Sequence, residues 1–146
     1  MKKVIFLAGL FLVAFNSFAG VCGNGSLTGA YNINVSDVDS GQSDHFVGRI
    51  NFNGKGAASI GGVSSNSGVA IGYTGSGTYS VTSACIATGT FSLSNGTKVT
   101  YWLYLDRMDT VPATNVAYHG NIVYKSTGEG GPGSGSGTID RVFGKF

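Results

Sequence analysis

The sequence predicts an all-β fold, a small antiparallel barrel of about eight strands, with a β-sandwich as the alternative. Apolar and small polar residues alternate along most of the chain, which is the pattern of half-buried strands. The composition, with 25 glycines and only 2 prolines, favours short strands and tight turns over helices. Glycines also stand in several apolar faces, at Gly29, Gly48, Gly89 and Gly120, and such positions suit a tightly coiled, closed sheet.

The N-terminus has the features of a signal peptide. Two lysines precede the apolar segment 4–15, and Ser17-Phe18-Ala19 has the small-x-small form of a cleavage site. We therefore expect residues 1–19 to be a signal peptide that is removed, and residues 20–146 to form one barrel domain. The apolar segment is too short for a membrane-spanning helix, and Val21 before Cys22 matches a lipoprotein site poorly. The mature protein should be periplasmic or secreted.

Charge argues against two classes of partner. Removal of the signal takes away two of the nine basic side chains, so seven basic side chains remain against seven acidic ones. Because no basic stripe is left, we expect neither nucleic acid nor an anionic membrane surface as a partner. No cofactor is expected either.

The two cysteines, Cys22 and Cys85, both follow the predicted signal peptide. In a chain that enters an oxidising compartment, a disulfide between them is the economical interpretation. A metal site is the weaker alternative, because the thiols have neither Cys-x-x-Cys spacing nor a neighbouring histidine.

The strands are expected at short intervals. The first, 27–36, has Leu27, Tyr31 and Ile33 on one face, and the second, 45–52, ends at the hairpin signal Asn53-Gly54. Further strands are predicted at 56–60, 69–73, 77–82, 85–93, 99–105, 118–124 and 138–143. Loops are predicted at 61–68 and in the glycine-rich segment 128–137. Asn95-Gly96 marks another hairpin turn.

Short motifs in this order carry a resemblance to a known group. They are Gly29 to Tyr31, Asn53-Gly54, Gly77 to Val81, Cys85, and Ser136 to Thr138. The pattern resembles that of exported bacterial proteins of unknown function that have a small calycin or allene-oxide-cyclase-like barrel. The resemblance implies the architecture and export, and it brings no catalytic residues to this chain.

Aromatic residues give the candidate ligand site. The strand 99–105 is apolar on both faces, which suggests a position beside a ligand, and two further tyrosines follow in strand 118–124. Tyr and Trp combine a large apolar area with a polar tip, so they suit a small amphipathic ligand. The candidate ligand-binding residues are Tyr101, Trp102, Tyr104, Tyr118 and Tyr124.

Two other groups are weaker candidates. The segment 37–44 carries Asp37, Asp39 and Asp44, which partly resemble an oxygen-rich calcium loop but lack its terminal glutamate. An ordinary acidic loop is the preferred interpretation there. Alternation places His45 and His119 opposite the apolar faces, so both should face solvent. A catalytic or metal pair would require them to converge with a carboxylate such as Asp44.

The expected function is therefore non-enzymatic binding of a small apolar or amphipathic ligand, or of a partner surface, by an exported barrel. An integral outer-membrane barrel is a second hypothesis. Mid-strand glycines and strands of about seven to nine residues, where roughly nine to eleven are needed, weigh against it. A structural or adhesive surface subunit is the third.

Overall fold

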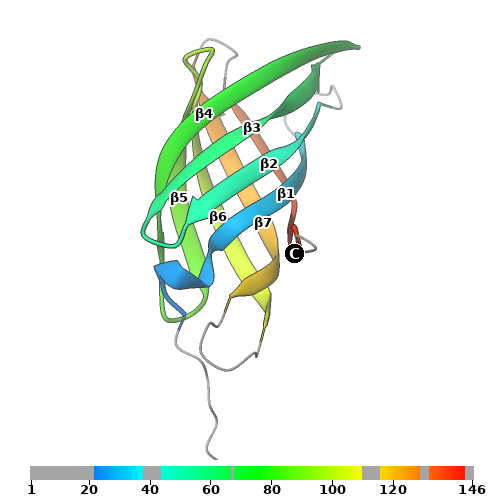
Figure 1. Ribbon diagram of the computed structural model, residues 1–146. Helices are drawn as coiled ribbons and strands as arrows, with labels where there is room; N and C mark the ends of the chain where they lie inside the picture. Colours follow the sequence, from blue (N-terminus) through cyan, green and yellow to red (C-terminus); the bar gives the residue numbers. More distant parts are fainter. Residues whose placement is uncertain (1–21, 38–43, 67, 110–115, 129–131, 144–146) are drawn as a thin grey trace, which may run out of the picture.

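The computed structural model describes residues 22–37, 44–66, 68–109, 116–128 and 132–143. These residues form a closed barrel of eight antiparallel strands that follows one turn of 3-10 helix (Figure 1). The elements are η1 (Asn24–Ser26), β1 (Thr28–Asp37), β2 (His45–Asn53), β3 (Ala57–Asn66), β4 (Val69–Val81), β5 (Ile86–Leu93), β6 (Lys98–Met108), β7 (Ala117–Thr127) and β8 (Gly133–Arg141). The predicted barrel is confirmed, and the sandwich alternative is wrong. The predicted signal peptide lies outside the described residues.

The strands are connected in the simplest up-and-down order. Each pairs with the next along the chain, and β8 pairs with β1 to close the sheet. The closing register sets Ile33 opposite Ile139. Closure gives every described strand two neighbours, so no edge strand is left to pair with another chain. No described helix has the length and apolar character needed to cross a membrane.

Both predicted hairpin signals are confirmed as turns. The Asn53 side-chain oxygen accepts hydrogen bonds from the backbone N–H groups of Lys55 and Ala57, at 2.8 and 3.0 Å, between β2 and β3. Asn95 accepts one from the Thr97 N–H, at 3.1 Å, between β5 and β6. Gly54 and Gly96 have φ values of +73° and +82°, the left-handed backbone that glycine adopts without strain.

Three strand boundaries differ from the prediction. The predicted loop 61–68 is largely strand, because β3 continues to Asn66, and segments 69–73 and 77–82 form one strand, β4. The glycine-rich segment 128–137 is not a loop throughout, because β8 begins at Gly133. Strand pairing uses backbone groups, so runs of glycine and serine can pair without the large side chains that mark a strand in sequence. The strands are 8 to 13 residues long, and β1, β3, β4, β6 and β7 exceed the predicted seven to nine residues, so strand length does not weigh against an outer-membrane barrel.

Inward-facing glycines make room for large side chains. A Cβ atom added to Gly48 would lie 3.0 Å from the ring of Phe46 in the same strand, and one added to Gly120 would lie 2.9 Å from Leu103 on the neighbouring β6. Gly29 differs from the prediction: it is exposed and has a φ of +98°, so its role is in the backbone at the start of β1.

The core is concentrated at one end of the barrel, where η1 and the turns β2–β3 and β4–β5 lie; we call this the closed end. Leu27, which follows η1, is fully buried there. The Tyr79 hydroxyl donates to the carbonyls of Leu27 and Asn24, at 2.8 and 3.1 Å, and ties η1 to β4. Fully buried large side chains in this part include Tyr31, Ile50, Leu103 and Ile139.

The predicted disulfide is confirmed. Cys22 and Cys85 form a disulfide bond, with their Cα atoms 5.1 Å apart, and Cys22 is only 4% exposed. Cys85 lies in the turn before β5, which begins at Ile86, rather than within the strand as predicted. Its backbone has a φ of +61°, in the left-handed region. The bridge fastens the segment before η1 to the β4–β5 turn at the closed end.

Candidate functional site

A cavity of about 180 Å³ occupies the other end of the barrel, where the turns β3–β4 and β5–β6 lie; we call this the open end. Apolar side chains from five strands form its wall: Ile33, Val35, Phe46, Ile60, Val99 and Ile122. All of them come from inward-facing positions of their strands. The closed end is packed with large side chains, so the interior is filled at one end and hollow at the other.

Two stacked rings line the cavity on the side of β5 and β6. The centroids of Phe91 and Tyr101 are 5.0 Å apart and their planes differ by 15°. Tyr101 lies over Gly89 on β5, where an added Cβ would be 2.5 Å from the tyrosine hydroxyl oxygen. The glycine therefore sets the position of this ring.

The Tyr101 hydroxyl is buried and has no hydrogen-bond partner among the described residues. The residue is only 1% exposed. Burial, with a smaller contribution from nearby Tyr79, raises the pKa of Tyr101 far above the ordinary value of a tyrosine. The side chain is therefore a neutral phenol, and its ring lies in the wall of the cavity with the hydroxyl covered.

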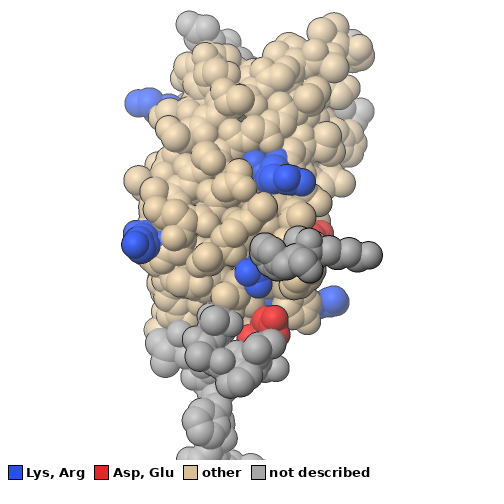
Figure 2. Space-filling view, in the orientation of Figure 1, with Lys and Arg blue, Asp and Glu red and all other residues tan. Residues whose placement is uncertain are grey.

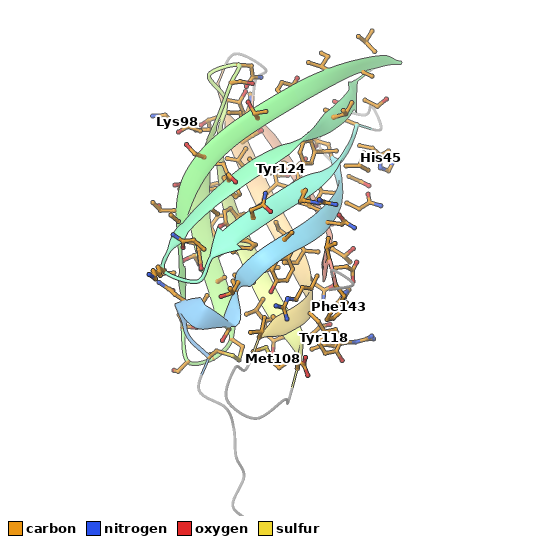
Figure 3. All side chains as sticks on the ribbon, in the orientation of Figure 1. His45, Lys98, Met108, Tyr118, Tyr124 and Phe143 are labelled. Atoms are coloured by element: carbon orange, nitrogen blue, oxygen red, sulfur yellow. A yellow bond between two sulfur atoms is a disulfide. The ribbon has the colours of Figure 1, made fainter. Side chains whose placement is uncertain are left out.

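Tyr124 lines the cavity on the side of β7, and Figure 3 labels it within the outline of the barrel. It lies directly opposite Gly135 on β8, where an added Cβ would be 2.6 Å from the ring. The glycines of β8, which suggested a loop in the sequence, thus give this tyrosine its space.

Polar side chains surround the opening of the cavity, which we call the mouth. They stand at strand ends and comprise Asp37, Asp44, Ser64, Thr97 and Ser126. The backbone N–H of Asp37 donates to the Asp44 carbonyl at 2.8 Å, so the two aspartates lie side by side. The Asp44 oxygen Oδ1 is covered and has no hydrogen-bond partner among the described residues. The charged side chains that line the cavity are both acidic.

The structure brings two of the five predicted aromatic residues together. Tyr101 and Tyr124 line the cavity, whereas Trp102 and Tyr104 are 41% and 57% exposed on the outer face of β6. The reason is the strand period: neighbouring residues of one strand point to opposite faces. Tyr118 is half-buried toward the closed end and does not line the cavity (Figure 3).

The sequence did not predict most of the apolar residues that line the cavity. It named Asp37 and Asp44 but did not place them at the mouth. Phe46, Phe91 and Ile60 could be assigned to the inner face by alternation, but alternation does not say which end of a barrel is hollow. Asp37 and Asp44 were expected in an acidic loop, and they lie at the mouth. Asp39 lies outside the described residues. The described residues contain no group of three His, Cys, Asp or Glu side chains arranged to hold a metal ion.

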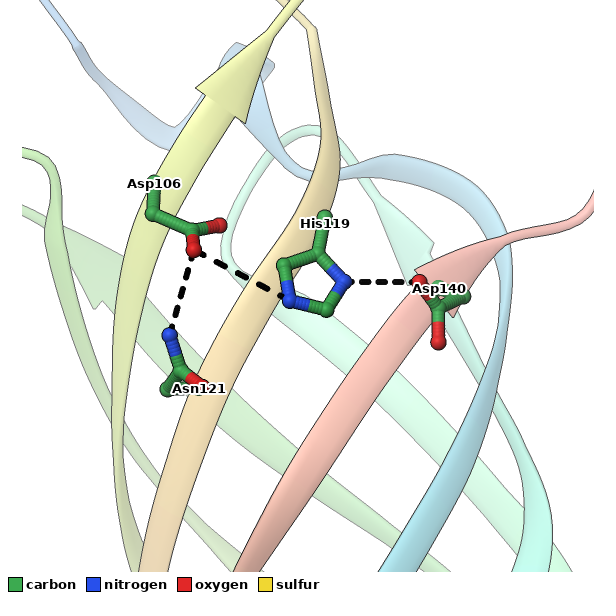
Figure 4. Close-up of polar contacts among 4 residues, drawn as sticks. All are labelled: Asp106, His119, Asn121 and Asp140. Atoms are coloured by element: carbon green, nitrogen blue, oxygen red, sulfur yellow. Dashed lines mark hydrogen bonds and ion pairs between the residues drawn. The ribbon is translucent and has the colours of Figure 1, made fainter.

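The two histidines do not converge. His45 is exposed, as predicted, and its Nδ1 lies 3.1 Å from the Ser36 hydroxyl. His119 is on the outer face between Asp140 and Asp106, with its nitrogens 2.7 and 3.8 Å from their carboxylates (Figure 4). Asn121 donates to Asp106 at 3.2 Å in the same cluster. This surface cluster contributes no side chain to the lining of the cavity.

Fold and cavity together define the chain as a small up-and-down β-barrel with one end hollow. No protein-family model matches the sequence, and no curated protein is significantly similar to it. Among solved structures, the chain is similar to EF1p2_mFAP2b bound to DFHBI, with a TM-score of 0.57 and 14% sequence identity. The match covers 80% of this chain and 94% of that one. At this identity, the similarity shows a shared fold.

Proposed function

We propose that this protein is an exported, non-enzymatic barrel that binds one small apolar or amphipathic ligand in the cavity at its open end. The observation that carries the proposal is the cavity itself, an apolar chamber with a few polar groups at its mouth. Such a combination is typical of small-ligand sites, and an eight-stranded barrel has room for one small ligand. The similar barrel EF1p2_mFAP2b, in its structure with DFHBI, supports a binding role for this architecture.

Export is supported by the disulfide, because such bonds persist in oxidising compartments. The polar part of the outer face favours a barrel surrounded by water over one in lipid. From Thr74 onward, the exposed positions of β4 are Thr74, Ser76, Thr78 and Ser80, and β5 adds Thr90 and Ser92. Apolar side chains are also exposed on the outer face, among them Val69, Ile71, Trp102 and Val123. Figure 2 shows few charged side chains on the side in view. Closure of the sheet also disfavours an adhesive subunit that assembles by strand addition.

The size of the cavity indicates the size of the ligand. A dry protein cavity of roughly 150 Å³ can hold benzene, so about 180 Å³ suits a single ring with a small substituent. We therefore choose p-cresol as the test probe. Its methyl-substituted ring suits the apolar wall, and its hydroxyl group suits the polar side chains of the cavity.

Binding of p-cresol to the mature protein is measured by isothermal titration calorimetry and by amide chemical shifts. Val99→Phe fills the cavity from its wall and should weaken binding by about tenfold or more. Val123→Phe makes the same substitution at a position 54% exposed on the outer face and should leave binding unchanged. Saturable binding that both variants retain, or no binding by the wild type, would refute the proposal. The p-cresol should be recovered chemically unchanged.

A further inference from the structure

We infer that the natural ligand of this cavity is a small aromatic amine, with its ring in the apolar chamber and its ammonium group at the mouth between Asp37 and Asp44. This inference rests on the proposed function and adds the chemical class and the orientation of the ligand. It is carried by the charge at the mouth and by two buried polar atoms that have no partner among the described residues.

The mouth is acidic. Asp37 and Asp44 are the charged residues among those that line the cavity. The Asp37 carboxylate lies on the inner side, where a Cβ added to Gly133 would be 2.9 Å from its oxygen. Two carboxylates beside an apolar wall attract a cation more strongly than they would in open water, because the local dielectric is lower. An anionic ligand would be repelled by the same pair.

The basic side chains on the neighbouring strands do not offset this charge inside the cavity. Lys98, at the start of β6, is exposed and lies outside the barrel in Figure 3. The Lys125 ammonium lies 5.6 Å from the centre of the Trp102 ring, on the outer face. Neither lysine is among the residues that line the cavity.

Two residues that line the cavity, Asp44 and Tyr101, each have a covered polar atom that a ligand reaches only when the side chain turns toward the cavity. Asp44 Oδ1 is an acceptor without a donor, and the Tyr101 hydroxyl is a donor without an acceptor, among the described residues. A buried polar atom left unpaired costs about 1 to 3 kcal/mol, so a ligand that supplies the missing partners recovers part of this cost. The missing partners are an N–H donor at the mouth and an acceptor oxygen beside Tyr101.

These requirements define a matched set of probes. Tyramine, p-cresol and 4-hydroxyphenylacetate share the phenol ring and its oxygen, and they carry a cation, no charge and an anion, respectively, at the other end. Because the ring is constant, differences in affinity among the three report the charge preference of the mouth. Calorimetry on the mature protein at neutral pH and low salt gives the three dissociation constants.

We expect tyramine to bind at least about tenfold more tightly than 4-hydroxyphenylacetate. High salt should weaken tyramine binding and leave p-cresol binding nearly unchanged, because ions screen only the charged contact. In Asp44→Asn, the ratio of tyramine to 4-hydroxyphenylacetate affinity should fall at least about threefold. Asp140→Asn removes the same charge from the outer face near the closed end and should leave the ratio unchanged.

The outcomes separate this inference from the proposed function. If p-cresol binds but the tyramine preference is below tenfold, or survives in Asp44→Asn, the amine assignment is wrong and the binding role stands. If none of the three probes binds, both are wrong. Should Asp44→Asn fail to fold, Asp37→Asn and the salt dependence of the wild type decide the question in its place.

Discussion

Three buried tyrosines in the interior differ in what their hydroxyl groups contact. The Tyr31 hydroxyl donates to the Ala117 carbonyl at 2.6 Å, which links β1 to β7 across the barrel. The Tyr79 hydroxyl donates to Leu27 and Asn24 at the closed end. The Tyr101 hydroxyl, beside the cavity, has no partner among the described residues. Two of these groups therefore stabilise the fold, whereas the third adds no such contact among the described residues.

Tyr→Phe substitutions should reveal this difference. Tyr31→Phe leaves a buried carbonyl without its donor and should lower the free energy of unfolding by about 1 to 3 kcal/mol. Tyr101→Phe removes an unpaired hydroxyl and should leave stability unchanged or raise it. Urea denaturation measures both. A loss of more than about 1 kcal/mol in Tyr101→Phe would mean that the hydroxyl has a partner in the folded state.

The same three tyrosines should make the free energy of unfolding depend on pH in the alkaline range. Burial raises the pKa of Tyr31 from 10.0 to about 12 and also raises the pKa of Tyr79 and Tyr101. The folded state therefore favours the neutral phenol, and this stabilisation is complete below pH 10 and is lost as the pH rises toward 12. Phenolate absorbance and circular dichroism should show the last tyrosines ionising as the barrel unfolds. Ionisation of all 7 tyrosines in a barrel that stays folded would contradict this.

At the scale of the strands, aromatic rings lie over glycines of the neighbouring strand. Tyr101 lies over Gly89 and Tyr124 over Gly135, so the glycines of β5 and β8 decide where the cavity rings stand. The pairing is reciprocal: the ring covers backbone that glycine leaves bare, and the missing side chain gives the ring its space. The shape of the cavity thus depends on small residues as much as on large ones.

Gly89→Ala should be strongly destabilising. Its Cβ would lie 2.5 Å from both the Tyr101 hydroxyl oxygen and the Thr78 carbonyl oxygen, and the backbone of a paired strand cannot move away easily. We expect a loss of about 2 to 3 kcal/mol in the free energy of unfolding, together with weaker p-cresol binding as the ring is displaced. Gly61→Ala is the matched control, because its Cβ would meet its nearest atoms at 3.9 Å. Equal losses in the two variants would show that crowding is not the cause.

Strands with large apolar side chains could be predicted from the sequence, and strands rich in glycine and serine could not. The alternation of β1 and of β5 to β7 identified them, because large apolar residues recur at every second position. The stretch Gly61 to Asn66 of β3 and the glycines of β8 carry few such residues, so their composition resembled loops. Their pairing comes from backbone hydrogen bonds that any residue except proline can make, and only the neighbouring strands reveal it.

At the scale of the whole molecule, the barrel has two unlike ends. Leu27, Tyr79 and the disulfide fill and fasten the closed end, while the cavity and the two aspartates occupy the open end. This polarity could not be predicted from the sequence, because it depends on which residues stand at one level around the barrel. Phe46 comes from β2, whereas Phe91 and Tyr101 come from β5 and β6, and only closure of the sheet brings β2 and these two strands around one chamber.

This separation predicts that the disulfide serves stability and leaves binding intact. Cys85→Ser should lower the thermal midpoint substantially, with a loss of about 2 to 4 kcal/mol, because the bridge limits the freedom of the unfolded chain. Binding of p-cresol below the new midpoint should match the wild type, since the cavity is at the other end. Mass spectrometry of the wild type should find Cys22 and Cys85 oxidised to each other.

The left-handed backbone of Cys85 allows two contributions to stability to be measured separately: the loss of the disulfide and the backbone conformation at position 85. Its φ of +61° is costly for any residue with a side chain, and glycine adopts it freely. Cys85→Gly should therefore be more stable than Cys85→Ser by about 1 kcal/mol, although both lack the bridge. Cys22→Ser, which removes the bridge and keeps the Cys85 side chain, should match Cys85→Ser in its thermal midpoint. An unchanged midpoint in all three variants would show that the bridge does not hold the closed end together.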